Sequence, residues 1–414
     1  MLFRSGQAFA TANPVDQRAA ELAQILNQKR SVESFFSPSF LAEIPASQIE
    51  SIARALIAAN GAVTGVEAVA SPDSRSGMID IGYERAVVRF ELALADNKPF
   101  RVIGLRMMSS QTRGDSPQKL IAEFAQLPGV ASLLVTKLNM PVPTSQFEYR
   151  ADDQRAVASS FKLWVLAEAA RQVAAGVRSW SDVVPLGPRS LPSGITQNWP
   201  AGAPMTLHSL AVLMISISDN SAADTLLLAL GRDKVDAVVT LTGHSQSAKT
   251  LPLLTTIEAF ALKMPLNASL RTRLITMNVG EKAALLKQNA GRLVQASIDS
   301  RQFANGPLLI DTIEWFASAH DMAATLDWLR RNGGETARAI LAINPGATPG
   351  VAARFDYIGF KGGSEAGVIA ANYLIRTKSG DWYGVTGSWN NAAALVDEPR
   401  FDTLMQRALG LIRP

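Results

Sequence analysis

A polar stretch at residues 109–118 divides the chain into two parts whose hydrophobic patterns differ. Its serines, threonine, glycine, aspartate and proline are residues that favour turns and loops. With 414 residues, the chain is also longer than one ordinary core usually serves. We therefore interpret the stretch as a linker, and expect a small domain over 14–112 and a larger one over 115–414.

The first part has helices followed by strands. Apolar residues recur at helical spacing over about 16–28 and 45–60. Strand-like runs then follow, separated by turn-rich pieces, at 63–69, 78–81, 86–94 and 101–108. This order indicates a small α+β domain and resembles the cone-shaped NTF2-like (isomerase-like) fold. No catalytic constellation stands out in it, so we interpret it as a structural or substrate-shaping domain.

The second part begins with a helix and a strand, at about 119–127 and 130–138. A long, mostly apolar helical section follows over about 158–342. Three strands and a last helix close it, at about 356–361, 366–377, 382–389 and 399–411, with a hairpin turn at 379–381. The pattern predicts an α/β sandwich, in which helices cover both faces of an antiparallel sheet.

Composition excludes several kinds of site. The chain has no cysteine, which removes disulfides, thiol catalysis and Cys-ligated metals. Its three histidines, His208, His244 and His320, lack the spacing of a zinc hydrolase, so we expect neither a metal nor another cofactor. The formal charge is +4 and no Lys/Arg block is interleaved with aromatic residues, so no nucleic-acid partner is expected. No apolar run reaches the length of a transmembrane segment.

The N-terminus leaves the compartment open. Ala8-Phe9-Ala10 looks like the small-residue end of a signal peptide, but the apolar segment that should precede it is missing. We interpret it as a truncated or mis-started signal, with an unstructured leader as the alternative. A periplasmic or secreted location is expected, and a cytoplasmic one stays open.

The sequence Ser159-Ser160-Phe161-Lys162 begins a helix that is apolar nearly all round and should be buried. Residues 159 and 162 are three apart, so their side chains share one helix face. A serine hydroxyl needs a base to become a nucleophile, and a lysine can act as one when desolvation lowers its pKa. A second S-x-x-K, Ser116 to Lys119, lies in the polar linker, and we take it as a chance match.

Two further motifs follow in order. Ser218-Asp219-Asn220 lies between two apolar helices, where it is either a loop pointing into a cleft or an ordinary N-cap. Lys361-Gly362-Gly363-Ser364 ends a predicted strand, where its glycines let a ligand approach the backbone; a β-bulge is the alternative.

Serine–lysine on a helix, then S-D-N, then K-[ST]-G on a strand is the signature of class A β-lactamases and penicillin-binding proteins. Residues 115–414 resemble this family of serine hydrolases. Together with the first domain, the chain is similar to the two-domain β-lactamase-like protein of the clavulanic acid pathway.

The resemblance implies a role for each motif residue. Ser159 is the nucleophile that becomes acylated, and Lys162 takes or relays its proton. Ser218 passes the proton to the leaving group, with Lys361 holding it electrostatically. Asn220 is expected to hydrogen-bond a substrate amide.

Three other positions complete the implied site. The backbone N–H groups of Ser159 and Ser364 are expected to bind the oxyanion. Gly363 and Ser364 are expected to contact substrate, while Asp219 braces its loop. At Gly362 the family's hydroxyl is missing, and Ser364 is the residue that could compensate.

A larger departure concerns release of the acyl group. The family's enzymes use an Ω-loop glutamate to activate water, but the corresponding segment, 243–252, contains no carboxylate. Glu258 lies in the following helix and is interpreted as structural, while Asp224 stands where the family has a second loop-bracing asparagine.

Three functions therefore remain open. The first is a β-lactamase-like hydrolase of β-lactams or related esters and amides. The second is a penicillin-binding D-alanyl-D-alanine carboxypeptidase or transpeptidase acting on peptidoglycan-like peptides. The third is a non-hydrolytic β-lactam-binding pseudoenzyme.

Overall fold

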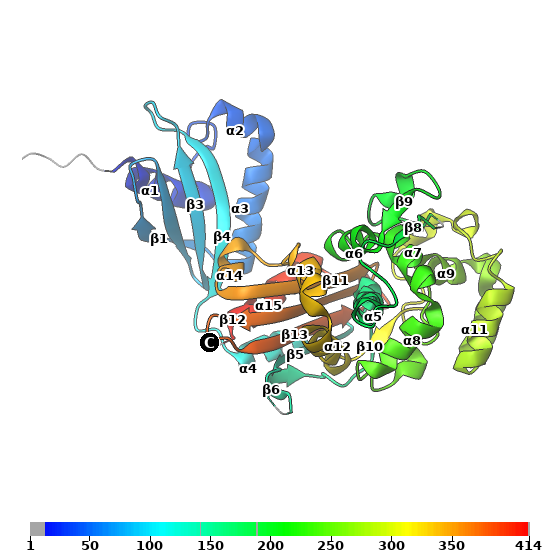
Figure 1. The fold of residues 1–414 in the computed structure, drawn as a ribbon. Coiled ribbons are helices and arrows are strands. Elements are labelled where there is room, and N and C mark those ends of the chain that lie inside the picture. Colours follow the sequence, from blue (N-terminus) through cyan, green and yellow to red (C-terminus); the bar gives the residue numbers. More distant parts are fainter. Residues whose placement is uncertain (1–12, 141, 188, 413–414) are drawn as a thin grey trace, which may run out of the picture. The chain divides into compact units, whose positions relative to one another are not determined.

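The computed structural model describes residues 13–140, 142–187 and 189–412 (Figure 1). The chain divides into two compact units. One comprises the residues up to Asp115 together with Thr348–Val351, and the other comprises Ser116–Ala347 and the residues from Ala352 onward. The predicted signal-like residues 8–10 lie outside the described part. Among the described residues, no helix combines the length and apolar character needed to cross a membrane.

In its described residues, the first unit has a four-stranded antiparallel sheet, three helices that precede the sheet and most of a short later helix, α14 (Pro349–Ala352). Its strands are hydrogen-bonded in the order β1-β2-β3-β4. Buried residues alternate with more exposed ones along β3. They pack with buried residues of α1 and β2 into an apolar core that includes Leu22 from α1, Ile79 from β2 and Phe90 from β3. The elements are α1 (Pro14–Leu26), α2 (Pro38–Glu43), α3 (Ala46–Asn60), β1 (Val63–Ala70), β2 (Ser76–Tyr83), β3 (Ala86–Leu94) and β4 (Val102–Thr112).

The predicted linker at 109–118 was wrong in extent. Residues 109–112 belong to β4, where Ser110 pairs with Val88 and Thr112 with Ala86. At its other end, Ser116 caps a helix through a hydrogen bond from the Lys119 N–H to its hydroxyl. The polar residues were misread because β4 is an edge strand, and an edge strand can carry polar side chains on its exposed positions.

The second unit is built on a five-stranded antiparallel sheet of order β11-β12-β13-β5-β6. The predicted strands 130–138, 356–361, 366–377 and 382–389 are confirmed, whereas β6 was not predicted because only one of its residues is buried. The elements are β5 (Val130–Lys137), β6 (Thr144–Tyr149), β11 (Phe355–Glu365), β12 (Val368–Thr377) and β13 (Trp382–Asn390).

Helices cover both faces of this sheet, as predicted. On β13, a Cβ at Gly384 would meet the Ala323 side chain, while a Cβ at Gly387 would meet the Met405 side chain. Residues an odd number of positions apart on a strand face opposite sides, so the helices that carry Ala323 and Met405 lie on opposite faces. These helices are α12 (Ala319–Asn332) and α15 (Glu398–Gly410), the second of which packs with α4 (Pro117–Ala125).

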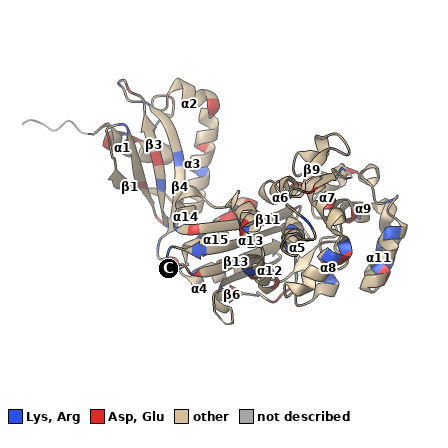
Figure 2. Ribbon diagram, in the orientation of Figure 1, with Lys and Arg blue, Asp and Glu red and all other residues tan. Residues whose placement is uncertain are grey.

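The helical section surrounds one helix, α5 (Lys162–Ala174), which is buried on all sides as its composition predicted. The remaining α-helices and strands of this unit are β7 (Arg155–Ala156), β8 (Val183–Pro185), β9 (Pro204–Thr206), α6 (Leu207–Ser216), α7 (Asn220–Leu230), α8 (Arg232–Leu241), α9 (Thr256–Lys263), α10 (Ala268–Thr276), α11 (Val279–Gln288), β10 (Phe316–Ala317) and α13 (Gly334–Ala342). Figure 2 shows acidic and basic residues interspersed along the elements of both units.

Candidate active site

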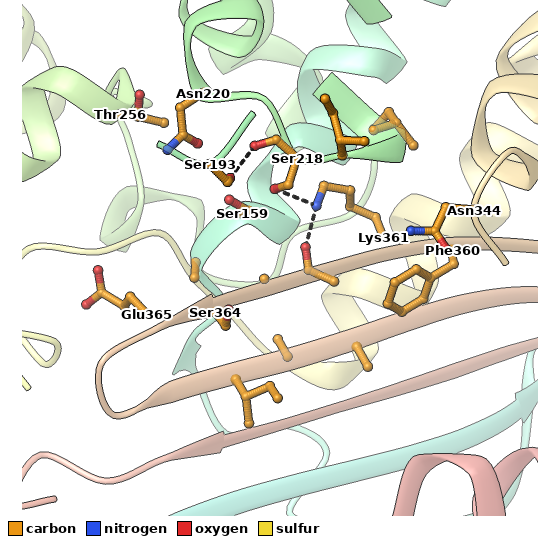
Figure 3. A pocket seen from close by; sticks show the side chains of 18 of the residues that line it. Ser159, Ser193, Ser218, Asn220, Thr256, Asn344, Phe360, Lys361, Ser364 and Glu365 are labelled. Atoms are coloured by element: carbon orange, nitrogen blue, oxygen red, sulfur yellow. Dashed lines mark hydrogen bonds between the residues drawn. The ribbon is translucent and has the colours of Figure 1, made fainter. Parts of the chain in front are cut away.

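A pocket of about 490 Å³ opens in the second unit where β11, the start of α7 and the turn before α5 meet. Figure 3 shows side chains from these three segments around it. Most of the predicted site residues line this pocket: Ser159, Ser218, Asn220, Lys361, Gly362, Gly363 and Ser364. The remaining one, Lys162, is fully buried behind it. Segments 159–162, 218–220 and 361–364 therefore meet in space, although up to 205 residues separate them.

Ser159 lies in a 3₁₀ turn, Ala158–Phe161, and the α-helix begins only at Lys162. This corrects the expectation that the serine starts the α-helix itself. The preceding residue, Ala158, has a φ of 43°, a left-handed conformation that costs a non-glycine residue roughly 1–3 kcal/mol. Within the described part of the chain the Ser159 hydroxyl makes no hydrogen bond. The turn therefore presents this side chain to the pocket.

The Lys162 amine is directed at the S-D-N loop. Its Nζ lies 2.6 Å from the Ser218 carbonyl oxygen, 2.6 Å from Asn220 Oδ1 and 3.2 Å from Ser218 Oγ. Burial holds the pKa of Lys162 well below its ordinary value, and the nearby Lys361 charge lowers this pKa further. All three contacts are hydrogen bonds from Lys162 Nζ to oxygens of the S-D-N loop, so the amine and the Ser218 hydroxyl lie within the distance that proton transfer needs.

Ser218 stands between two lysines. Its Oγ also accepts a hydrogen bond from Lys361 Nζ at 3.0 Å, and burial lowers the pKa of Lys361 to about 7. Ser218 has a φ of 58°, and its carbonyl oxygen accepts a further bond from the Ser193 hydroxyl at 2.7 Å. A left-handed serine fixed in this way has its hydroxyl placed between two amines whose pKa values are both lowered by burial, an arrangement suited to proton transfer.

Asp219 braces the loop, as expected. Its carboxylate accepts hydrogen bonds from the backbone N–H groups of Ile195, Thr196 and Ala222 and from the Thr196 hydroxyl, at 2.5–2.9 Å. The bond from Ala222 also makes it the N-cap of α7, so the loop and N-cap interpretations hold together. The carboxamide of the next residue, Asn220, accepts from Lys162 and donates to the Leu191 carbonyl at 3.1 Å, which leaves one N–H for a ligand.

Gly363 lies against the nucleophile turn. A Cβ at this position would be 2.3 Å from the Val157 carbonyl oxygen and 2.6 Å from the Ser159 nitrogen, so only glycine fits. The pairing of β11 with β12 runs without a shift from Tyr357 to Glu365, so the alternative of a β-bulge was wrong. The strand is therefore regular where it passes the serine.

Sequence reasoning missed Phe360 and Asn372. The Phe360 ring lies beside Gly362, where a Cβ would be 2.9 Å from the end of that ring. The Asn372 side chain donates to Ser160 Oγ at 2.8 Å and ties the nucleophile turn to β12. Period-2 alternation could have grouped Phe360 with Gly362, but the contact between Asn372 and Ser160 spans 212 residues and leaves no local pattern.

Glu258, the carboxylate nearest to the expected acyl-release segment, and Asp224, at the position of the family's loop-bracing asparagine, both have structural partners. Glu258 forms a capping box with Thr255 and pairs with Arg232 at 2.7 Å, which confirms its interpretation as structural. Asp224 accepts three hydrogen bonds from Thr256 and Ile257, and burial raises its pKa to about 6.

The histidines lie away from the pocket. The buried His244 shares its ring nitrogens with the Phe316 carbonyl and the Gln246 N–H, and neither His208 nor His320 lines the pocket. Across the residues that the structure describes, no group of three or more His, Asp or Glu is arranged to hold a metal ion.

Comparison with known proteins gives one family. The sequence model of the "Beta-lactamase enzyme family" matches residues 116–401, which is more than half of the chain. A search of curated proteins gives no match.

Several solved structures are similar to this chain. A β-lactamase from Sphaerobacter thermophilus is 20% identical, with 72% of this chain and 98% of that chain covered and a TM-score of 0.49. A β-lactamase from Chitinophaga pinensis is 13% identical, with 72% and 98% covered and a TM-score of 0.49. The structure of PBP-A is 14% identical, with 71% and 93% covered and a TM-score of 0.49.

Proposed function

The chain belongs to the β-lactamase enzyme family, and from this premise we propose that its second unit is a serine hydrolase acting through a covalent acyl-enzyme at Ser159. The observation that carries the proposal is the position of the Ser218 hydroxyl between the amines of Lys162 and Lys361, at 3.2 and 3.0 Å. Both amines have lowered pKa values because they are buried, and Ser218 and Ser159 line the same pocket.

Acylation follows from this arrangement. Ser159 Oγ bonds to the substrate carbonyl carbon while its proton passes to the neutral Lys162 amine. The tetrahedral species collapses as the bond from carbon to the leaving nitrogen or oxygen breaks. Ser218 gives its proton to that atom and is reprotonated by Lys162. Lys361, as an ammonium, stabilises the negative charge that develops on Ser218 Oγ during this relay.

The oxyanion is proposed to bind the backbone N–H groups of Ser159 and Ser364. Each donor of this kind is typically worth about 3 kcal/mol of barrier. Support comes from Gly363, which lets β11 lie against the Ser159 nitrogen. In this way two N–H groups from different elements serve one carbonyl oxygen.

The proposed substrates are β-lactams or related esters and amides. Among the described residues that line the pocket, Lys361 is the only one with a basic side chain. No hydroxyl stands at position 362 for a substrate carboxylate, so Ser364 is the proposed alternative contact. Asn220 is proposed to bind the substrate amide through its remaining N–H.

For the first unit we propose an NTF2-like fold with a substrate-shaping or structural role. Three helices that precede a four-stranded antiparallel sheet support this proposal. Removal of this unit should therefore alter substrate preference or stability and leave acylation chemistry intact.

Intact-mass measurement with benzylpenicillin and with p-nitrophenyl acetate tests the proposal. We expect an adduct that maps to Ser159 and is lost in Ser159→Ala. The matched control is Ser116→Ala in the other S-x-x-K, which should acylate normally. Absence of an adduct with both probes would refute the proposal.

These measurements also separate the three functions left open by the sequence. Rapid turnover of benzylpenicillin fits the β-lactamase-like hydrolase. A persistent penicilloyl adduct fits a penicillin-binding peptidase, and turnover of the ester alone fits an esterase.

A further inference from the structure

Strand β11 presents three alternate residues to the side of the nucleophile. Its register is continuous to Glu365, so Lys361, Gly363 and Glu365 share one face. The Cβ direction of Gly363 points at the Ser159 nitrogen, which identifies this face as the one that meets the 3₁₀ turn. Glu365 therefore lies on the nucleophile face, about 7 Å along the strand from Gly363 and on the side away from Lys361.

Figure 3 agrees with this order, because Lys361 and Glu365 lie toward opposite ends of the view with Ser159 between them. The family mechanism described above uses only the Lys361 side of the serine. The Glu365 side has a carboxylate that no step yet employs.

Glu365 is the least buried member of a cluster of three charged residues, which also contains Lys263 and Glu314. Lys263 Nζ donates to Glu365 Oε1 at 2.5 Å and to Glu314 Oε1 at 2.8 Å. The side chains of Lys263 and Glu314 are fully buried, whereas that of Glu365 is 13% exposed and lines the pocket. Two carboxylates share one ammonium, so the cluster can take up a proton at its pocket-facing end.

The cluster tunes Glu365 as a base. Burial and the neighbouring Glu314 hold the pKa of Glu365 well above its ordinary value, while Lys263 acts against this rise. A carboxylate with a raised pKa is a stronger proton acceptor than one in water, which is what activation of a water molecule at neutral pH requires.

Other carboxylates near the pocket are less suited to this task. Asp219 is saturated by four donors and Asp224 by three. Glu398 and Asp402 line the pocket from α15. That helix covers the sheet face opposite to α12. The nucleophile turn lies on the α12 face, as two neighbouring strand residues show. Asn372 bonds to Ser160 of the turn, and Thr386, which pairs directly with Asn372, bonds to the Ala319 carbonyl of α12.

We propose that Glu365 accepts the proton of the water that releases Ser159 from its acyl-enzyme; this rests on the proposed function. The water oxygen bonds to the acyl carbon, and one water proton moves to the Glu365 carboxylate. The bond from that carbon to Ser159 Oγ then breaks, and Glu365 returns the proton to Oγ. The other water proton leaves on the product carboxylic acid, which ionises in solvent.

The test is Glu365→Gln in the full chain, with benzylpenicillin and p-nitrophenyl acetate as probes and with adduct formation and loss followed by quench-flow and intact mass. Acylation should stay within about threefold of wild type. Adduct loss should slow by roughly 10²–10⁴-fold, the usual contribution of a general base. Hydroxylamine, which is a stronger nucleophile than water, should restore release from the variant. The matched control is Glu335→Gln, an exposed glutamate at the start of α13 that does not line the pocket, and this variant should release its adduct at the wild-type rate.

A pH profile distinguishes a base from a merely structural carboxylate. The titratable groups that face Glu365 are Lys263 and Glu314, with Lys361 across the pocket. The rate of adduct loss in the wild type should rise with pH through the pKa of Glu365. In Glu365→Gln this rise should be absent from the pH profile. Glu314→Gln removes the negative charge next to Glu365, so the rise in the rate of adduct loss should occur at lower pH than in the wild type.

Four outcomes would overturn the inference. A Glu365→Gln variant that releases its adduct as fast as wild type would do so, as would a variant that hydroxylamine does not rescue. A wild-type adduct that persists would refute the inference and leave acylation standing. If wild type forms no adduct with either probe, the proposed function fails and the inference fails with it.

Discussion

Replacement of Gly363 by alanine adds one methyl group at the most crowded contact of the site. The new Cβ would lie 2.3 Å from the Val157 carbonyl oxygen, 2.6 Å from the Ser159 nitrogen and 2.8 Å from the Ser160 nitrogen. Ordinary contacts begin at about 3.4 Å, so the strand or the turn must move by about 1 Å. All three neighbours are backbone atoms, and none can rotate away.

The expected cost has two parts. Overpacking of a tight contact costs about 1–3 kcal/mol of stability. A 1 Å misplacement of reacting groups costs about 10²-fold in rate, and here the displaced groups are Ser159 and the N–H proposed to bind the oxyanion. We therefore expect Gly363→Ala to remain folded with a lower melting temperature and to acylate about 10²-fold more slowly.

The matched control is Gly362→Ala, one residue away on the opposite face of the strand. Its Cβ would meet the end of the Phe360 ring at 2.9 Å, and a side chain can yield where backbone cannot. Stopped-flow measurement of the p-nitrophenol burst gives the acylation rate of both variants. The reasoning is refuted if Gly363→Ala acylates within threefold of wild type, or if Gly362→Ala is the slower variant.

Two further predictions concern stability. Between about pH 7 and 10 the unfolded chain keeps Lys361 protonated while the folded chain has lost that proton, so stability should rise with pH by up to about 1.4 kcal/mol per unit. Calorimetry on Lys361→Met should show a shallower slope, and an unchanged slope would contradict the assignment. In Asp219→Asn, the buried backbone N–H groups that now donate to the carboxylate would face an amide, which is a weaker hydrogen-bond acceptor. Denaturant unfolding should therefore show a free energy of unfolding lower by about 3 kcal/mol or more. The exposed Asp233→Asn serves as the control and should change stability by under about 0.5 kcal/mol.

The sequence predicted the parts of the fold that have a local signal. The buried helix α5 was visible because it is apolar nearly all round, and the strands of the central sheet were visible because β-branched and aromatic residues recur in them between turn signals. The edge strands β4 and β6 escaped in whole or in part, since water on one side permits polar residues that look like loop. The 3₁₀ turn before α5 was missed as well, because its geometry depends on contact with Gly363.

The candidate site shows the same division. The three motifs could be found because each is a short run with a fixed order. The pairing of Lys162 with Asn220 and the Lys263–Glu314–Glu365 cluster could not be found, since their members are 51 to 102 residues apart and have no shared periodicity. Long-range polar contacts are set by the packing of whole elements, which a single sequence does not display.

The order of strands in the central sheet has a consequence for biosynthesis. β5 is among the first elements of its unit to leave the ribosome, yet its partner β13 is among the last, and the buried bond between Ser132 and Ser388 spans 256 residues. This part of the sheet can close only after β13 has been synthesised, because chains fold vectorially while non-local pairing is slow. Translation that stops before β13 would leave β5 with an unpaired edge that is prone to aggregation. Completion of the central sheet therefore depends on synthesis of the β12–β13 hairpin.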